Sequence, residues 1–158
     1  MNRTYKILVA VLLPIALVLG CSSNSNEAGP PVSFSVIGTG GNLGGAAVET
    51  KIFETYQDQT SFDNALANYS IAIDDVAIDF ATEQVALVSM GQRTSGGYSI
   101  AAESVSDAGA YIELKLMLSS PGADCVVTGA LTHPYQVLSI NSQKEVRTNE
   151  RTVTENCS

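Results

Sequence analysis

The sequence predicts a mainly β fold, a small β-sandwich or partly open barrel with one short helix. Short apolar runs recur between residues 33 and 154, and turn or breaker residues separate them, as is typical of all-β domains. Only one stretch has its apolar residues at helical spacing. We expect a single β-rich domain over residues 32–158, which is long enough to bury a core.

The first predicted strand covers residues 33–37, where Phe34 and Val36 alternate with serines. The glycine-rich segment 38–45 predicts that this strand stops and a mobile loop begins. A phosphate-binding loop is the less favoured alternative, because the glycine spacing misses the dinucleotide fingerprint and no Gly-Lys-Ser follows. A second strand is expected at residues 48–54.

The predicted helix covers residues 61–69, with Ser61 as its N-cap and apolar residues at Phe62, Leu66 and Tyr69. A strand is expected at residues 76–80 from the alternation of apolar and small or polar residues. The apolar run at 85–90 then predicts a buried central strand.

The rest of the chain predicts further strands, separated by the turn signals Asp107-Ala108-Gly109, Pro121-Gly122 and Pro134. Valines and threonines in the polar tail 145–154 predict an edge strand whose charges discourage aggregation. The other expected strands are residues 99–105, 111–118, 126–131 and 136–140.

The first twenty residues have the order of a secretory signal peptide. Two basic residues precede the apolar run 7–19, which is too short to span a bilayer comfortably. The segment Val18-Leu19-Gly20-Cys21 resembles the bacterial lipobox, which implies cleavage after residue 20 and acylation of Cys21, for example with palmitate. We expect a flexible tether over residues 21–31; a plain secretory signal or an uncleaved anchor helix is the alternative.

This resemblance implies a lipid-anchored protein of the bacterial cell envelope. Ser22 differs from the aspartate that retains many such lipoproteins at the inner membrane, which favours the outer membrane where the cell has one. Removing Arg3 and Lys6 with the signal takes the formal net charge from −8 to −10. Nucleic acid is therefore not expected as a partner.

Two cysteines remain once Cys21 carries lipid. Cys125 and Cys157 form an even pair in a compartment that permits disulfides, and we predict that they are bonded; two free thiols are the alternative. The lone His133 and two distant cysteines lack the paired short spacing of zinc sites. We expect no metal and no cofactor.

The most distinctive string is Gly-Gln-Arg-Thr-Ser-Gly-Gly-Tyr-Ser-Ile at residues 91–100. Together with the buried run 85–90, the alternating run 111–118 and Leu-Thr-His-Pro-Tyr at 131–135, it resembles the C-terminal domain of the PrcB family over about residues 76–140. The resemblance implies a lipoprotein subunit that associates with a surface serine protease and supports its assembly or stability.

The turn at 93–98 is the candidate binding loop. Its glycines let the backbone approach a partner closely, and its tyrosine offers a rigid anchor. An alternative, compatible with this one, is that the glycines supply the positive φ of a hairpin while the tyrosine packs in the core. The turn also resembles, more faintly, the loop by which chagasin-type inhibitors enter protease clefts. The residues are Arg93, expected in solvent, Thr94, Ser95, Gly96, Gly97 and Tyr98.

No catalytic residues are predicted, and we do not expect an enzyme. His133 is the sole histidine, and the segment 97–101 misses the Gly-x-Ser-x-Gly elbow at its last residue. The sequence therefore favours a membrane-anchored lipoprotein whose β domain binds another envelope protein, such as a secreted protease. A protease-inhibitor-like module and a structural envelope protein are the alternatives.

Overall fold

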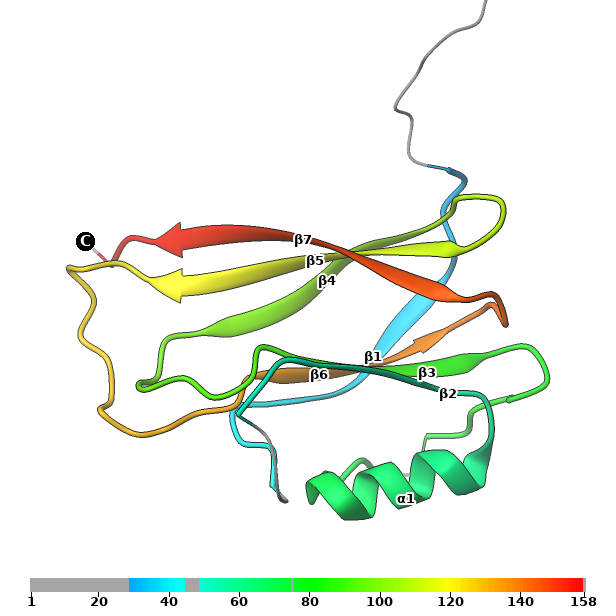
Figure 1. Cartoon of the computed structure of the whole chain (residues 1–158), viewed down its shortest axis with the longest axis horizontal. Helices are drawn as coiled ribbons and strands as arrows, with labels where there is room; N and C mark the ends of the chain where they lie inside the picture. Colours follow the sequence, from blue (N-terminus) through cyan, green and yellow to red (C-terminus); the bar gives the residue numbers. More distant parts are fainter. Residues whose placement is uncertain (1–28, 45–48, 75, 158) are drawn as a thin grey trace, which may run out of the picture.

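The computed structural model describes residues 29–44, 49–74 and 76–157. Within them the strands form two sheets that stack face to face, so the predicted small β-sandwich is confirmed (Figure 1). The elements in chain order are β1 (Phe34–Gly40), β2 (Ile52–Tyr56), α1 (Gln59–Tyr69), β3 (Gln84–Ser89), β4 (Ser99–Asp107), β5 (Ile112–Pro121), β6 (Tyr135–Ile140) and β7 (Val146–Glu155).

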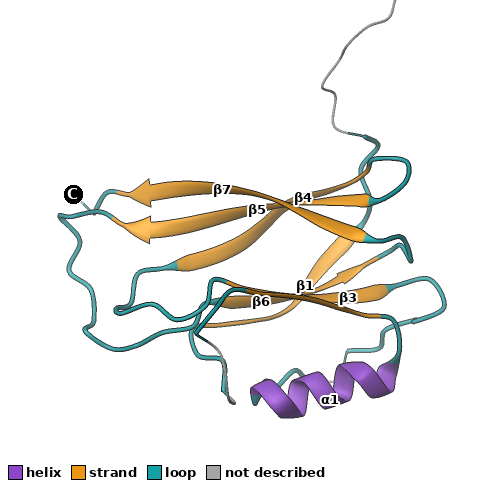
Figure 2. Cartoon of the chain, in the orientation of Figure 1, coloured by secondary structure: helices purple, strands orange, loops and turns teal. Residues whose placement is uncertain are grey.

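One sheet has four antiparallel strands in the order β1-β6-β3-β2. The other has three strands in the order β4-β5-β7, and β7 runs parallel to β5. The helix α1 covers the outer face of the four-stranded sheet, so the molecule has three layers, sheet on sheet on helix (Figure 2). No strand ladder joins the two sheets in the described part of the chain, so they form a sandwich and not a closed barrel.

Strand β3 is buried along its whole length because it lies between two cores. Ala86 and Val88 point into the core between the sheets, whereas Val85 and Leu87 point into the core beneath α1. A strand covered on both faces needs apolar residues at every position. This arrangement explains the uninterrupted run at 85–90 and confirms the expectation of an internal strand.

The first three residues of the glycine-rich segment do not form the loop that was expected, because β1 continues to Gly40. A bulge falls between Val36 and Gly38. A Cβ atom on Gly40 would lie 2.6 Å from the ring of Tyr135, so only glycine lets the strand backbone lie this close to the ring. The prediction that β1 ends at residue 37 was wrong because close packing, rather than a turn, accounts for these glycines.

The strand predicted at residues 76–80 is absent from the described part of the chain. Ile78 and Phe80 pack against the core beneath α1, which gives the alternating pattern without strand pairing. The backbone turns at Asp79, whose carbonyl oxygen accepts from the amides of Thr82 at 2.9 Å and Glu83 at 2.8 Å. The alternation of apolar residues at 76–80 therefore reflects packing against the core, in a segment that is not a strand.

The helix begins two residues earlier than predicted, at Gln59. Asp58, not Ser61, is the N-cap, and its Oδ1 accepts a hydrogen bond of 2.8 Å from the Ser61 amide. At the other end Ser70 adopts a left-handed conformation that closes the helix.

Strand β7 confirms the predicted edge strand, and its side chains are almost all exposed. Its arginines are paired with carboxylates: Arg151 bonds Glu103, and Arg147 bonds Glu145 while lying 4.3 Å from the ring centroid of Tyr111. Exposed pairs of this kind contribute little stability, so we read them as protection of a free edge.

The predicted signal peptide, Cys21 and the tether up to residue 28 lie outside the described residues. The last two residues of the predicted tether contact β4. The Pro30 carbonyl accepts from the Asp107 amide at 2.9 Å, and Pro31 forms a bridge with Ser106. No helix among the described residues is long and apolar enough to cross a membrane.

Two tyrosines share one carboxylate beneath β2. Tyr56 and Tyr69 both donate their hydroxyl protons to Glu54, the latter over 2.9 Å. Burial, followed by the hydrogen bond to Glu54, raises the pKa of Tyr56 well above its ordinary value. The neutral phenol is therefore the form that the folded state prefers.

This raised pKa predicts a loss of stability in alkali. Tyr56 stays neutral in the folded chain but ionises near pH 10 in the unfolded chain, so its contribution is complete below about pH 10 and is lost as the pH rises further. The urea midpoint should fall between pH 9 and pH 11, and it should fall less in Tyr56→Phe. An equal fall in both proteins would contradict this assignment.

Candidate functional site

Three segments far apart in sequence meet at one end of the sandwich, which we call the disulfide end. They are residues 91–98, between β3 and β4; residues 122–134, between β5 and β6; and residues 155–157, which include the last residue of β7. Figure 1 shows the two loops and the end of β7 together on the left of the molecule. The candidate binding loop belongs to this end.

The turn at 93–98 is fastened to the facing loop and does not close on itself as a hairpin. Arg93 and Thr132 exchange two backbone hydrogen bonds, of 2.8 and 3.0 Å. The Gly96 amide donates to the Thr128 carbonyl over 2.9 Å, and the Thr132 hydroxyl donates to the Ser95 carbonyl over 2.8 Å. The expected hairpin was therefore wrong, since the turn forms its hydrogen bonds with the 122–134 loop and not across its own two arms.

Arg93 is half-buried, contrary to the expectation of a solvated side chain. Its Nη2 donates to the Met90 carbonyl at 2.8 Å, and its guanidinium lies 5.6 Å from the ring centroid of Tyr98. Tyr98 in turn packs against the core between the sheets, as the structural alternative expected. These two side chains position the turn, and Thr94 is exposed beside them.

Gly97 is needed for the contact between the two loops. Its φ is +85°, and a Cβ atom there would lie 2.9 Å from Val127 and 3.0 Å from Pro121. We expect Gly97→Ala to lower the free energy of unfolding by about 1–3 kcal/mol because it adds backbone strain and a clash. Gly129→Ala is the matched control, since nothing lies within 4 Å of its Cβ position. Equal denaturation midpoints for the two variants would refute this role.

The predicted disulfide between Cys125 and Cys157 is present, with 4.9 Å between the Cα atoms. Two hydrogen bonds accompany it: the Gly122 amide donates to the Glu155 carbonyl at 2.8 Å, and the Cys157 amide donates to Asp124 at 3.1 Å. The C-terminal segment therefore holds the base of the 122–134 loop.

This loop carries exposed apolar side chains that the sequence reading missed. Val126 is fully exposed, Leu131 is 59% exposed and Val127 is 38% exposed. The strand predicted at 126–131 was wrong, because the segment has no ladder partner among the described residues, and its backbone bonds the turn at 93–98 through the Thr128 carbonyl. The glycine at 129 and the breakers at both ends of the loop were the signals for an irregular segment.

His133 lies where this loop returns to the sheet. Its amide donates to the Gly41 carbonyl, and its Nε2 is buried with no hydrogen-bond partner among the described residues. Within that part of the chain the structure therefore presents no hydrogen-bonded pair of nucleophile and histidine base at Nε2. The histidine joins the loop to the end of β1.

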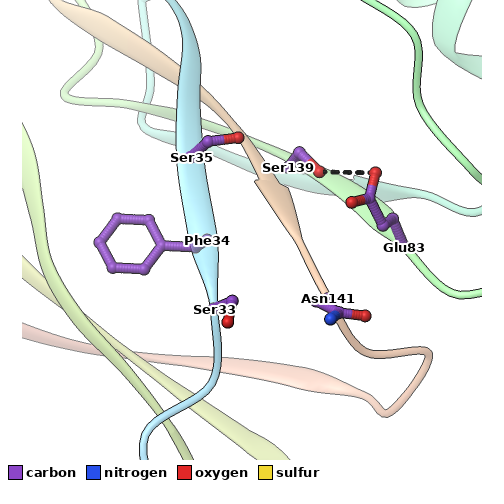
Figure 3. Close-up of a pocket in the computed structure, with 6 residues that line it drawn as sticks. All are labelled: Ser33, Phe34, Ser35, Glu83, Ser139 and Asn141. Atoms are coloured by element: carbon purple, nitrogen blue, oxygen red, sulfur yellow. Dashed lines mark hydrogen bonds between the residues drawn. The ribbon is translucent and has the colours of Figure 1, made fainter.

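A small open pocket of about 180 Å³ lies near the other end of the four-stranded sheet, between β1 and β6 (Figure 3). The Ser139 hydroxyl donates to Glu83 over 3.1 Å, and the pocket has no cationic side chain. It is smaller than the usual ligand pocket and is lined by Ser33, Phe34, Ser35, Glu83, Ser139 and Asn141. We do not assign it a ligand.

Comparison with known protein families identifies one part of this structure. Residues 84–141 match the PrcB C-terminal family. This match confirms the resemblance seen in the sequence for these residues. No curated protein and no solved structure gives a significant match to the chain. The fainter likeness to chagasin-type inhibitors stays a prediction.

The PrcB C-terminal segment contributes two strands to each sheet, β3 and β6 to one and β4 and β5 to the other. It also contains the turn at 91–98 and the loop at 122–134. The elements β1, β2, α1 and β7 lie outside it, as does Cys157. The matched segment thus holds both loops of the disulfide end but only one of its two cysteines.

Proposed function

We propose that the chain is a non-catalytic accessory subunit that binds a secreted protease through the disulfide end, while an acyl anchor on Cys21 holds it on a bacterial cell envelope. The observation that carries this proposal is that the PrcB C-terminal segment includes both surface loops of that end. The resemblance to this family implies association with a protease complex. Exposed apolar side chains on a fastened loop are typical of a protein-binding surface.

The orientation of the domain supports this assignment. The described chain begins beside the end of β4 at Ser106 and Asp107, whereas the disulfide end adjoins the start of the same strand at Ser99. A strand of this length spans roughly 25–30 Å. A domain tethered through its N-terminus would therefore hold its binding end away from the lipid surface.

Recovery of the partner from envelope extracts tests the proposal. We expect the full-length chain to co-purify a hydrolase that a fluorophosphonate probe labels, since such probes react with active serine proteases. Thr94→Lys, in the exposed turn, should reduce the recovery, whereas Thr148→Lys, on the exposed strand β7, should not. Absence of a labelled protease, or equal recovery with both variants, would contradict the proposal.

Assays with the recovered protease separate an accessory subunit from an inhibitor. An accessory subunit preserves or raises the protease activity when added in excess, and an inhibitor abolishes it. Hydrolysis by the purified chain alone would contradict a non-catalytic role. Mass spectrometry of the mature N-terminus tests the anchor, and an unmodified Cys21 would refute it.

A further inference from the structure

The surface of the disulfide end has a specific chemistry that goes beyond partner binding in general. Three of the large apolar side chains with marked exposure belong to the 122–134 loop: Val126, Val127 and Leu131. The facing turn adds only uncharged exposed groups, such as Thr94. The centre of this surface is therefore apolar and uncharged.

The loop holds these side chains outward because it is fastened along its length. The disulfide and the Gly122–Glu155 hydrogen bond hold its base, and Thr128 and Thr132 bond the 93–98 turn. A loop that is already ordered loses little conformational entropy when a partner binds. The exposed side chains are therefore held in place before a partner binds.

The rim of the surface is acidic. Asp124 and Glu155 lie beside the disulfide, and both are exposed. Arg93 is the one lysine or arginine of the three segments that form this end, and it is half-buried against Tyr98 and the Met90 carbonyl. The whole chain carries a formal net charge of −8. The field at this end therefore favours cations around an apolar contact.

Resting on the proposed function, we infer that the disulfide end recognises a segment of the partner protein in which apolar side chains are flanked by lysine or arginine. The apolar side chains contact Val126, Val127 and Leu131, and the flanking cations face Asp124 and Glu155. A second copy of this chain fits less well, because in a two-fold contact the same acidic surface would face itself.

Two matched synthetic peptides test this inference on the full-length chain. Both have the same Val-Leu-Val centre, one flanked by pairs of lysines and the other by pairs of glutamates. NMR titration should show amide shifts at residues 124–131 with the lysine peptide, weakening as salt is raised, and much smaller shifts with the glutamate peptide. Equal binding of both peptides, or shifts confined to other residues, would overturn the inference.

Variants identify the contact. Val126→Asp should weaken binding of the lysine peptide about tenfold or more, whereas Val76→Asp, a change of another exposed valine between α1 and β3, should leave it within about twofold. Equal weakening by both variants would overturn the assignment, as would sedimentation data showing a dimer that Val126→Asp dissociates. If the protease still co-purifies with Val126→Asp, this inference fails while the proposed function stands.

Discussion

Replacing both Cys125 and Cys157 with serine should lower the free energy of unfolding by about 2–4 kcal/mol. The bond closes a loop across 32 positions of the sequence, and its loss returns that conformational entropy to the unfolded chain. Because the bond also joins the C-terminal segment to the 122–134 loop, the double variant should lose order at the disulfide end before the sheets unfold.

Urea denaturation and hydrogen exchange measure these two effects. The midpoint should fall, and amides at the base of the loop, such as Gly122, should exchange faster at urea concentrations where the β3 amides remain protected. Reducing agent should reproduce this change in the native protein and leave the double variant unaffected. A variant as stable as the parent would show that the bond is dispensable for this end.

The core between the sheets should be the most sensitive to truncation, and Leu138→Ala is expected to cost about 2–5 kcal/mol. Leu138 lies on β6, is fully buried and pairs with neighbours in both β1 and β3. Truncating the Leu138 side chain leaves a cavity, and β6 cannot easily move to fill it because it is hydrogen-bonded to a strand on each side.

The same substitution on the surface provides the control. Leu131→Ala, at the exposed loop, should change the free energy of unfolding by less than about 0.5 kcal/mol. Calorimetry of both variants compares them directly. Similar melting temperatures for the two would show that β6 does not occupy the central position described.

Much of this fold could be predicted because burial leaves a clear pattern in the sequence. The run at 85–90 is apolar throughout since β3 has a core on each face, and the tail 145–154 is polar since β7 is an edge. The helix was predicted through Phe62 and Tyr69, which point into one core. Its start was misplaced because both Asp58 and Ser61 are good caps.

The errors arose where apolar residues pack without pairing. Residues 76–80 and 126–131 both have the composition of strands. However, residues 76–80 pack against the core beneath α1, and residues 126–131 are exposed. Pairing depends on which backbone lies alongside, and local sequence does not encode that. The glycines at 38–40 were misread for a related reason, since the need for close approach to Tyr135 comes from a residue far along the chain.

The candidate site was predicted in part. The turn at 93–98 and the disulfide were found from the sequence, but their meeting at one end depends on the sandwich topology. The contribution of Val126 and Leu131 was missed because apolar residues are ordinarily assigned to a core.

Hydrogen exchange of the full-length chain, measured with and without the co-purified protease, tests the central proposal most directly. We expect added protection at residues 91–98 and 122–134, with little change in α1 and β1. Protection confined to α1 or to the outer face of the three-stranded sheet would place the partner elsewhere and contradict the assignment of the disulfide end.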